Sequence, residues 1–265
     1  MDERRKMTAP ELRAMKMRGE KISMLTTYDY PMGQLVDQAG IDIALIGDSL
    51  GRVVLGYKNE LQVTMEDIIS HAAAVARGAK RALVVADLPF MSYQVSDEEA
   101  VRNAGRLVRE SGAEVVKLEG AAYLSAIRKI IAAGIPVMGH VGLTPQSVHQ
   151  LGGVRKKVGK DADSAARVKS DALDLQDAGV CGIVLEAIPA DLAANITNSL
   201  DIPTFGIGAG PDCDGQVVVM HDILGLYREF RPSFVKLYAD IWQATLDAFS
   251  AYNSDVKEGR FPVRK

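Results

Sequence analysis

The chain has 265 residues, of which 48% are hydrophobic and 25% are charged. This is an ordinary globular composition, which excludes disorder as the main state. The formal net charge of −3 provides no general positive field that would attract nucleic acid or an anionic membrane.

Neither the start nor the middle of the chain has the pattern of a membrane-directed segment. The stretch Met1–Lys21 is rich in Arg, Lys and Glu and has no apolar core, so it does not resemble a secretory signal. The stretch Ile130–Val154 is free of formal charge, but its prolines and glycines predict a strand and a loop. Cys181 and Cys213 lack CxxC spacing, which predicts a protein of the reducing cytoplasm.

Short β-rich runs alternate with amphipathic stretches along the chain. Thr8-Ala9-Pro10-Glu11 has the spacing of a capping box and predicts a short helix at about 8–17. Strands are predicted at Ile22–Tyr28, Ile41–Asp48, Leu83–Pro89, Val115–Gly120, Ile135–Gly142, Gly182–Ala187, Pro203–Gly208 and Gln216–Met220. Helices are predicted at Thr64–Arg77, Asp97–Glu110, Tyr123–Ala132, Ala162–Gln176 and Asp191–Ser199, with a C-terminal helix at about 232–252.

This alternation predicts an α/β protein with a parallel sheet and right-handed crossovers. Two architectures fit it: a closed (β/α)8 TIM barrel and an open doubly wound sheet. An open sheet usually carries a Gly-rich phosphate turn after its first strand, whereas this chain continues with Tyr28-Asp29-Tyr30-Pro31. The barrel is therefore favoured. No linker or shift in composition marks a boundary, so residues 1–265 are predicted to form a single barrel domain.

Polar residues gather at the ends of the predicted strands, where catalytic groups lie in a barrel. They are Asp48 and Ser49, Asp87, Lys117 and Glu119, His140, and Glu186. Lys117 and Glu119 are two residues apart and so share a face of their strand. Five successive strand ends with such residues predict an active site.

Each residue taken alone also has a structural explanation. Asp48 could cap the following helix, and Asp87 could brace the turn that leads into Pro89. Lys117 and Glu119 could form an ion pair at the rim of the barrel. His140 could be a neutral, hydrogen-bonded core histidine, and Glu186 could pair with a basic neighbour.

The group as a whole predicts a metal site, because buried carboxylates need cations to offset their desolvation. Three acids against one Lys leave negative charge that a divalent ion would neutralise. Ligation by Asp and Glu oxygens suggests a hard cation, with Mg²⁺ favoured. Zinc is disfavoured because the other three histidines show no HxxxH or HxH spacing.

The same stretches resemble a known family. They are Thr26–Tyr30 (TTYDY), Ile46–Gly51 (IGDSLG), Ala86–Phe90 (ADLPF), Val116–Gly120 (VKLEG), Gly139–Ser147 (GHVGLTPQS), Val184–Glu186 (VLE) and Gly206–Asp222 (GIGAGPDCDGQVVVMHD). On these residues the chain resembles the ketopantoate hydroxymethyltransferases from Leu25 to Asp222. It departs from the family pattern at Val158-Gly159-Lys160, where Gln-Gly-Arg is usual, and it ends without a longer tail.

The resemblance implies a TIM barrel of the phosphoenolpyruvate/pyruvate type with Mg²⁺ as cofactor. It implies transfer of a hydroxymethyl group from the co-substrate 5,10-methylenetetrahydrofolate to 3-methyl-2-oxobutanoate (α-ketoisovalerate). The product would be 2-dehydropantoate (ketopantoate), in pantothenate and coenzyme A biosynthesis. A cytoplasmic homodecamer, a pentamer of dimers, is also implied, with small-molecule partners and neither nucleic acid nor membrane.

The resemblance also implies roles at matching positions. The implied metal residues are Asp48, Asp87 and Glu119. The implied substrate-binding residues are Asp48, Ser49, Asp87, Lys117 and His140. Glu186 is the implied catalytic proton acceptor.

Two other functions stay open at this point. Another metal-enolate lyase of the isocitrate lyase or phosphoenolpyruvate mutase type would share the chemistry, but such enzymes usually carry a KKCGH-like loop, which this sequence lacks. A barrel that only binds a metabolite would not need the polar strand ends.

Overall fold

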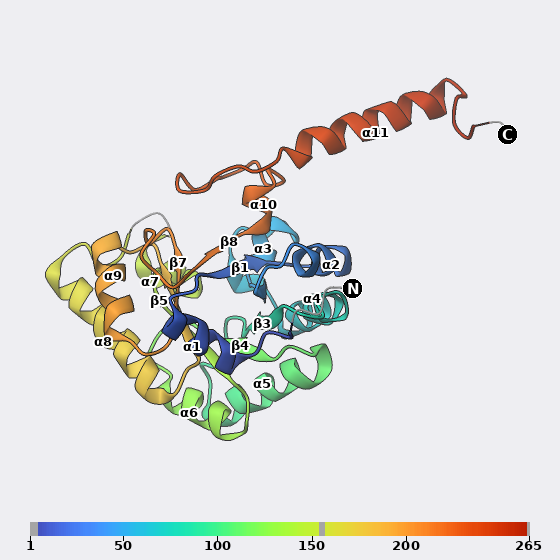
Figure 1. The fold of residues 1–265 in the computed structure, drawn as a ribbon. Coiled ribbons are helices and arrows are strands. Elements are labelled where there is room, and N and C mark those ends of the chain that lie inside the picture. The colour runs from blue at the N-terminus through green and yellow to red at the C-terminus, as the bar shows by residue number, and fades with distance from the viewer. Residues whose placement is uncertain (1–4, 154–156, 264–265) are drawn as a thin grey trace. The chain divides into compact units, whose positions relative to one another are not determined.

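Eight parallel strands close into a barrel in chain order, as Figure 1 shows for the computed structural model. The structure describes residues 5–153 and 157–263. The strands are β1 (Ile22–Thr26), β2 (Ile43–Ile46), β3 (Leu83–Asp87), β4 (Val115–Lys117), β5 (Val137–Gly142), β6 (Gly182–Glu186), β7 (Thr204–Ile207) and β8 (Gly215–Val218). The predicted (β/α)8 barrel is confirmed, and each of the eight predicted strands has a counterpart.

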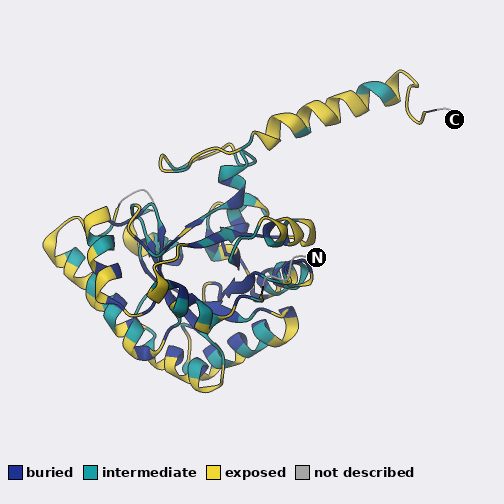
Figure 2. Cartoon of the chain, viewed as in Figure 1, coloured by how far each residue is buried: buried dark blue, intermediate teal, exposed yellow. Residues whose placement is uncertain are grey.

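The longer helices that follow the strands cover the outside of the barrel. They are α2 (Tyr30–Gln38), α4 (Met65–Gly78), α5 (Asp97–Ser111), α6 (Leu124–Ala132), α8 (Ala162–Ala178) and α9 (Ala190–Ser199), with α1 (Ala9–Arg18) before the first strand. Short turns of helix lie in the loops: α3 (Leu50–Val53), η1 (Glu60–Gln62), η2 (Pro145–Ser147) and α7 (Val148–Leu151). Figure 2 shows buried residues along the strands and exposed residues on the outer helix faces.

Local sequence signals explain where several of these helices begin and end. Thr64 and Asp67 form a capping box at the start of α4. Gly112 and Gly179 end α5 and α8 with φ of 79° and 95°, a left-handed conformation that favours glycine. These glycine turns return the chain to the next strand.

Two local predictions need correction. Helix α1 starts after Thr8 as predicted, but the Thr8 side chain makes no capping bond, and Glu11 instead accepts a hydrogen bond from Arg18. Helix α2 is absent from the predicted elements. Asp29 begins it by accepting a hydrogen bond from the Met32 amide at 2.8 Å, with Pro31 in its first turn.

Helix α1 lies against the amino-terminal ends of the strands. Its Leu12 and Met15 belong to the same buried cluster as residues from all eight strands. Lys16 donates to the backbone oxygen of Thr197 at 2.8 Å and pairs with Asp214 at 3.0 Å. Asp214 comes directly before β8, so these contacts close the end of the barrel where the strands begin. Chemistry is left to the opposite end.

The chain divides into two compact units, Met1–Val217 and Val218–Lys265. The second unit contains α10 (Met220–Ile223) and α11 (Ile241–Lys257). The predicted C-terminal helix starts at Ile241 rather than at about 232, because Asp240 provides the cap by accepting a hydrogen bond from Gln243. The single-domain organisation stays a prediction. In the part of the chain that the structure describes, no helix has the length and hydropathy to cross a membrane.

Candidate active site

The carboxyl ends of five neighbouring strands, β2 to β6, carry the polar residues that the sequence singled out. Asp48 follows β2, Asp87 ends β3, Lys117 ends β4, and Glu186 ends β6. Glu119 lies two residues beyond β4, and His140 lies within β5. All except Glu186 are at least 95% buried, and the Glu186 side chain is 21% exposed. The structure therefore brings these residues together at one end of the barrel.

Asp87 lies at the centre of the first group of contacts. Its Oδ1 lies 2.8 Å from Nζ of Lys117, its register partner on the next strand. Its Oδ2 accepts a hydrogen bond from the Asp48 amide at 3.0 Å. Lys117 therefore pairs with Asp87 and not, as one alternative held, with Glu119 at the rim. Asp87 holds a buried cation and the backbone of the β2 loop rather than only bracing a turn.

Burial and crowding of negative charge raise the pKa of two of the acids. Burial raises the pKa of Asp48 well above its usual range, and the charges of Asp87 and Glu119 raise it further. Burial also raises the pKa of Asp87, although Lys117 opposes this shift. Burial alone would lower the pKa of Lys117, but the charges of the carboxylates, Asp87 first among them, together outweigh burial and raise this pKa, so Lys117 stays charged. The site thus concentrates more negative charge than Lys117 neutralises.

His140 lies between two glutamates. Its Nδ1 is 3.4 Å from Oε1 of Glu119, and its Nε2 is 3.3 Å from Oε2 of Glu186. Burial disfavours the charged imidazole, but these two carboxylates outweigh burial and raise the pKa of His140 to about 9. His140 is therefore a buried cation near neutral pH and not the neutral core histidine of the alternative reading.

Ser49 lies beside this group at the start of α3. Its Oγ is 2.9 Å from the hydroxyl of Tyr28, and its side chain does not cap α3. The Asp48 side chain does not cap that helix either, because its Oδ2 accepts a hydrogen bond from Gln146 Nε2 at 2.9 Å. The loop after β2 thus presents Asp48 and Ser49 to the site.

Neutral residues that sequence reasoning missed connect the acids. Gln146, in η2 after β5, donates from its amide to Oε2 of Glu119 at 2.9 Å and from its side chain to Asp48. Tyr93, after β3, donates to Oε1 of Gln146 at 2.7 Å. Gln146 stands in the GHVGLTPQS stretch, but nothing in its sequence position indicates these partners.

A further buried acid, Glu60, was also missed. It is 5% exposed and lies in η1, with Oε1 3.8 Å from Nη1 of Arg52. Burial raises its pKa against the opposing charge of Arg52, and the nearby charges of Glu186 and Glu119 raise it further. Glu60 is therefore electrostatically coupled to the acids of the site.

The donor set fits a hard divalent cation in its chemistry. Asp48, Asp87 and Glu119 are buried oxygen donors, and a dication would relieve the mutual repulsion that raises the Asp48 pKa. Among the described residues, Oδ1 of Asp48 accepts no hydrogen bond. Within the described ranges, no group of three or more His, Cys, Asp or Glu side chains is already arranged to coordinate a metal ion. Mg²⁺ needs no such arrangement, because it usually takes one or two carboxylates, substrate oxygens and several waters.

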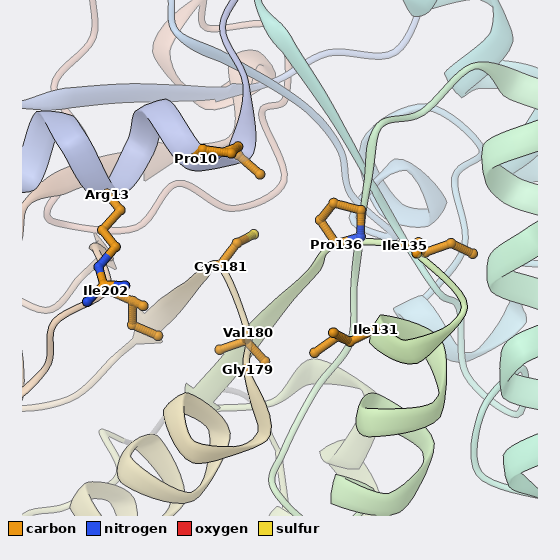
Figure 3. Close-up of a pocket in the computed structure, with 11 residues that line it drawn as sticks. Pro10, Arg13, Ile131, Ile135, Pro136, Gly179, Val180, Cys181 and Ile202 are labelled. Carbon is orange, nitrogen blue, oxygen red and sulfur yellow. The ribbon is translucent and has the colours of Figure 1, made fainter.

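A separate pocket of about 420 Å³ lies at the other end of the strands. Figure 3 shows it between Pro10 and Arg13 of α1 and the residues that precede β5 and β6, such as Pro136 and Cys181. Its lining is mostly apolar. Because the strands are parallel, their first residues lie at the opposite end of the barrel from Glu186 and His140. This pocket is therefore not the candidate active site.

Comparison with known proteins identifies the family of the chain. The model of the ketopantoate hydroxymethyltransferase family matches residues 6–264. The chain belongs to this family. It is 56% identical over 263 residues to the 3-methyl-2-oxobutanoate hydroxymethyltransferase of Moorella thermoacetica, covering 99% of this chain and 97% of that one. It is 52% identical over 265 residues to the enzyme of the same name from Pelobacter propionicus, covering 100% and 98%.

Solved structures with a similar fold come from a wider group of barrel enzymes. A phosphonopyruvate hydrolase in complex with oxalate and Mg²⁺ has a TM-score of 0.62 at 12% identity, covering 96% of this chain and 88% of that one. A 2,3-dimethylmalate lyase, described as a phosphoenolpyruvate mutase/isocitrate lyase superfamily member, has a TM-score of 0.60 at 16% identity, covering 97% and 90%. At these identities the likeness concerns the fold alone. The lyase alternative therefore shares the barrel, whereas the sequence places the chain among the hydroxymethyltransferases.

Proposed function

We propose that this enzyme transfers a hydroxymethyl group from 5,10-methylenetetrahydrofolate to 3-methyl-2-oxobutanoate, giving 2-dehydropantoate for pantothenate and coenzyme A biosynthesis. Family membership supports the reaction. The observation that carries the proposal to this chain is the arrangement at the ends of β2 to β6. A buried, acid-rich cluster leads to one partly exposed carboxylate, Glu186.

The chemistry requires a weakly acidic C3–H bond of the keto acid to be broken. We propose that Asp48, Asp87 and Glu119 supply the negative charge that would hold Mg²⁺. When bound, this ion would act as a Lewis acid toward the keto acid and offset the negative charge that develops on its oxygen. Asp48 Oδ1, which accepts no hydrogen bond among the described residues, is the donor best placed for such a role.

Lys117 and Ser49 would bind and orient the keto acid together with Asp48, Asp87 and His140. The buried ammonium of Lys117 is fixed by Asp87 at 2.8 Å, so it provides positive charge without the cost of reorganising it. The Ser49 hydroxyl is oriented by Tyr28. These residues supply charge and hydrogen bonds for an anionic substrate of a few carbons.

Glu186 would accept the C3 proton. A general base must be able to reach the substrate. Of the six ionisable side chains at these strand ends, Glu186 is the only one with substantial exposure. Protonated His140, with Nε2 3.3 Å from Oε2 of Glu186, would orient the carboxylate. The carbon that loses its proton would then attack the methylene carbon of the folate, forming a C–C bond as one of the two C–N bonds of the methylene bridge breaks. Water would then replace the remaining nitrogen on that carbon, which leaves the hydroxymethyl group on C3 and releases tetrahydrofolate.

Product analysis tests this function directly. The protein is mixed with 3-methyl-2-oxobutanoate, 5,10-methylenetetrahydrofolate and Mg²⁺, and the mixture is examined for 2-dehydropantoate and free tetrahydrofolate in equal amounts. A lyase of the isocitrate lyase type would yield neither product from these substrates. Absence of both would refute the proposed transfer.

We also propose that the chain forms a cytoplasmic homodecamer, a pentamer of dimers. Helix α11 supports self-association, because it has no buried residue and exposes Trp242, Leu246 and Phe249 at helical spacing. A second copy of the chain is the occupant that we propose for this face, because most soluble oligomers are homo-oligomers. The lack of CxxC spacing between the two cysteines supports a reducing compartment.

A further inference from the structure

Gln146 makes five hydrogen bonds beside the candidate metal residues, and in one of them its Oε1 accepts from Nε2 of Gln94 at 3.3 Å. Its backbone amide donates to Oε2 of Glu119 at 2.9 Å, and its Nε2 donates to Oδ2 of Asp48 at 2.9 Å. Its Nε2 also donates to the Leu88 carbonyl at 3.0 Å, and its Oε1 accepts from the Tyr93 hydroxyl at 2.7 Å. We call Gln146 with Asp48, Glu119 and Tyr93 the Gln146 network.

The direction of each bond in the Gln146 network is fixed by its partners. The Leu88 carbonyl can only accept, so the nitrogen of the Gln146 side chain must face it, and the same nitrogen lies 2.9 Å from Oδ2 of Asp48. The oxygen then faces the hydroxyl of Tyr93, which stays neutral because burial raises the pKa of that tyrosine. The Tyr93 oxygen in turn accepts a hydrogen bond from the Glu119 amide at 3.2 Å. A reversed amide would place oxygen against oxygen, so only one orientation is stable.

Burial makes the network rigid and costly to disrupt. Gln146 is 6% exposed and Tyr93 is 2% exposed, so a lost hydrogen bond here would not be replaced by bulk water. Asp48 and Glu119 repel each other, and Glu119 is one cause of the raised Asp48 pKa. The two donors of Gln146 point at one oxygen of each acid and offset part of that repulsion.

We propose that Gln146 is a positioning residue for the divalent cation and that Tyr93 sets its orientation. By engaging Oδ2 of Asp48 and Oε2 of Glu119, Gln146 fixes both carboxylates and leaves Oδ1 of Asp48 for the ion. The inference rests on the proposed function, because it assumes that these acids bind a metal. It assigns to two neutral residues the task of orienting the ligands.

Mn²⁺ binding measured by electron paramagnetic resonance tests the inference without substrate or turnover. Gln146→Met keeps the length of the side chain and the backbone amide that faces Glu119, but it removes the side-chain donor to Asp48. The Mn²⁺ dissociation constant should rise by roughly 10–100-fold, the usual effect of losing a residue that orients a ligand. Tyr93→Phe should raise it by less. The double variant should bind no more weakly than Gln146→Met, because both changes remove the same orientation.

Thr197→Val is the matched control. Thr197 is also buried and loses hydrogen bonds to Ala193 and Thr204 on substitution, but it contacts none of the site residues. Its midpoint of thermal unfolding should fall while its Mn²⁺ affinity stays at the wild-type value. If Gln146→Met does not fold, Tyr93→Phe carries the test, with circular dichroism confirming its fold.

The outcomes separate this inference from the proposed function. Wild-type Mn²⁺ binding with equal affinity in Gln146→Met or Tyr93→Phe overturns the positioning role and leaves the proposed function standing. Strictly additive losses in the double variant overturn the link between Tyr93 and Gln146. A wild-type protein that binds neither Mn²⁺ nor Mg²⁺ overturns the metal-dependent function and the inference with it.

Discussion

Nε2 of His140 lies 3.3 Å from Oε2 of Glu186, across the neighbouring strands β5 and β6. This contact joins a buried cation to the most exposed carboxylate of the site. It couples the charge state of the histidine to the position of the candidate base, and it places that base at the mouth of the cluster rather than within it.

Glu186→Gln should slow proton removal while leaving keto-acid binding little changed. The amide keeps the shape of the side chain but cannot accept the C3 proton, so exchange should fall by roughly 10²–10⁴-fold. The measurement is loss of the C3 methine signal of 3-methyl-2-oxobutanoate by proton NMR in D₂O with Mg²⁺ and no folate. Glu114→Gln, just before β4, is the control, since Glu114 pairs with Lys6 away from the site. Exchange as fast as wild type would make Glu186 structural and direct attention to His140.

Metal removal should abolish turnover. Exhaustive chelation takes away the charge that offsets three buried acids, and Mg²⁺ should restore activity better than Ca²⁺, whose looser coordination suits the site less. Asp87→Ala should also weaken metal binding, as measured by isothermal titration calorimetry. Full activity of the chelated protein would refute metal dependence.

Gly142→Ala should lower stability and displace Glu186. Gly142 has φ of 97°, and an added Cβ would lie 2.3 Å from the backbone oxygen of Glu186. Gly134→Ala is the control, because Gly134 has φ of 87° but nothing within 4 Å of its Cβ position. Gly134→Ala should lose about 1–2 kcal/mol of unfolding free energy from backbone strain alone. Gly142→Ala should lose more and should also lose C3 exchange activity; equal losses would argue against the clash.

The stability of the metal-free protein should depend on pH through His140. Its folded-state pKa of about 9 exceeds its ordinary value of 6.5, so its favourable contribution is fully present below 6.5 and is lost as pH rises through about 9. Urea unfolding of wild type and His140→Gln should therefore differ most near pH 6 and differ less above about pH 9. A difference that stays constant across this window would contradict the raised pKa.

Light scattering should return an assembly far larger than the 28.5 kDa chain. Phe249→Glu places a charge on the exposed apolar face of α11 and should shift the assembly toward smaller species. Ala251→Glu, about 200° around the helix from Phe249, should have little effect. A monomer for wild type at working concentration would refute the homodecamer.

The barrel could be predicted because its signal is repeated along the chain. Buried strands such as Ile43–Ile46 occur all along the chain, and glycine turns such as that at Gly179 follow several of the helices, so a local error does not change the architecture. Helix α2 was not predicted, because Pro31 lies in its first turn and because the stretch Tyr28–Pro31 was considered only for a Gly-rich phosphate turn. Its cap becomes visible only when the Asp29 side chain is seen to accept from the Met32 amide.

The charged members of the site could be predicted because charge is rare at buried strand ends. Which of these charged residues pair with each other could not be predicted. Lys117 and Glu119 were predicted to share a strand face, yet β4 ends at Lys117, and Lys117 pairs with Asp87, which the register of β3 and β4 places directly opposite. Gln146 carries no charge, and its partner Asp48 is 98 residues away in the sequence. No local pattern can indicate such a contact, because it depends on how two loops meet.

The bond between Tyr93 and Gln146 also limits how this barrel can be recombined. The two residues belong to different loops, one after β3 and the other after β5, and each completes the other's hydrogen bonding in a buried space. A chimaera that imports only one of these loops from a distant barrel would leave an orphaned hydroxyl or amide beside Glu119. The two loops therefore depend on each other, and a design that changes the substrate preference of this barrel by loop grafting has to replace both loops together.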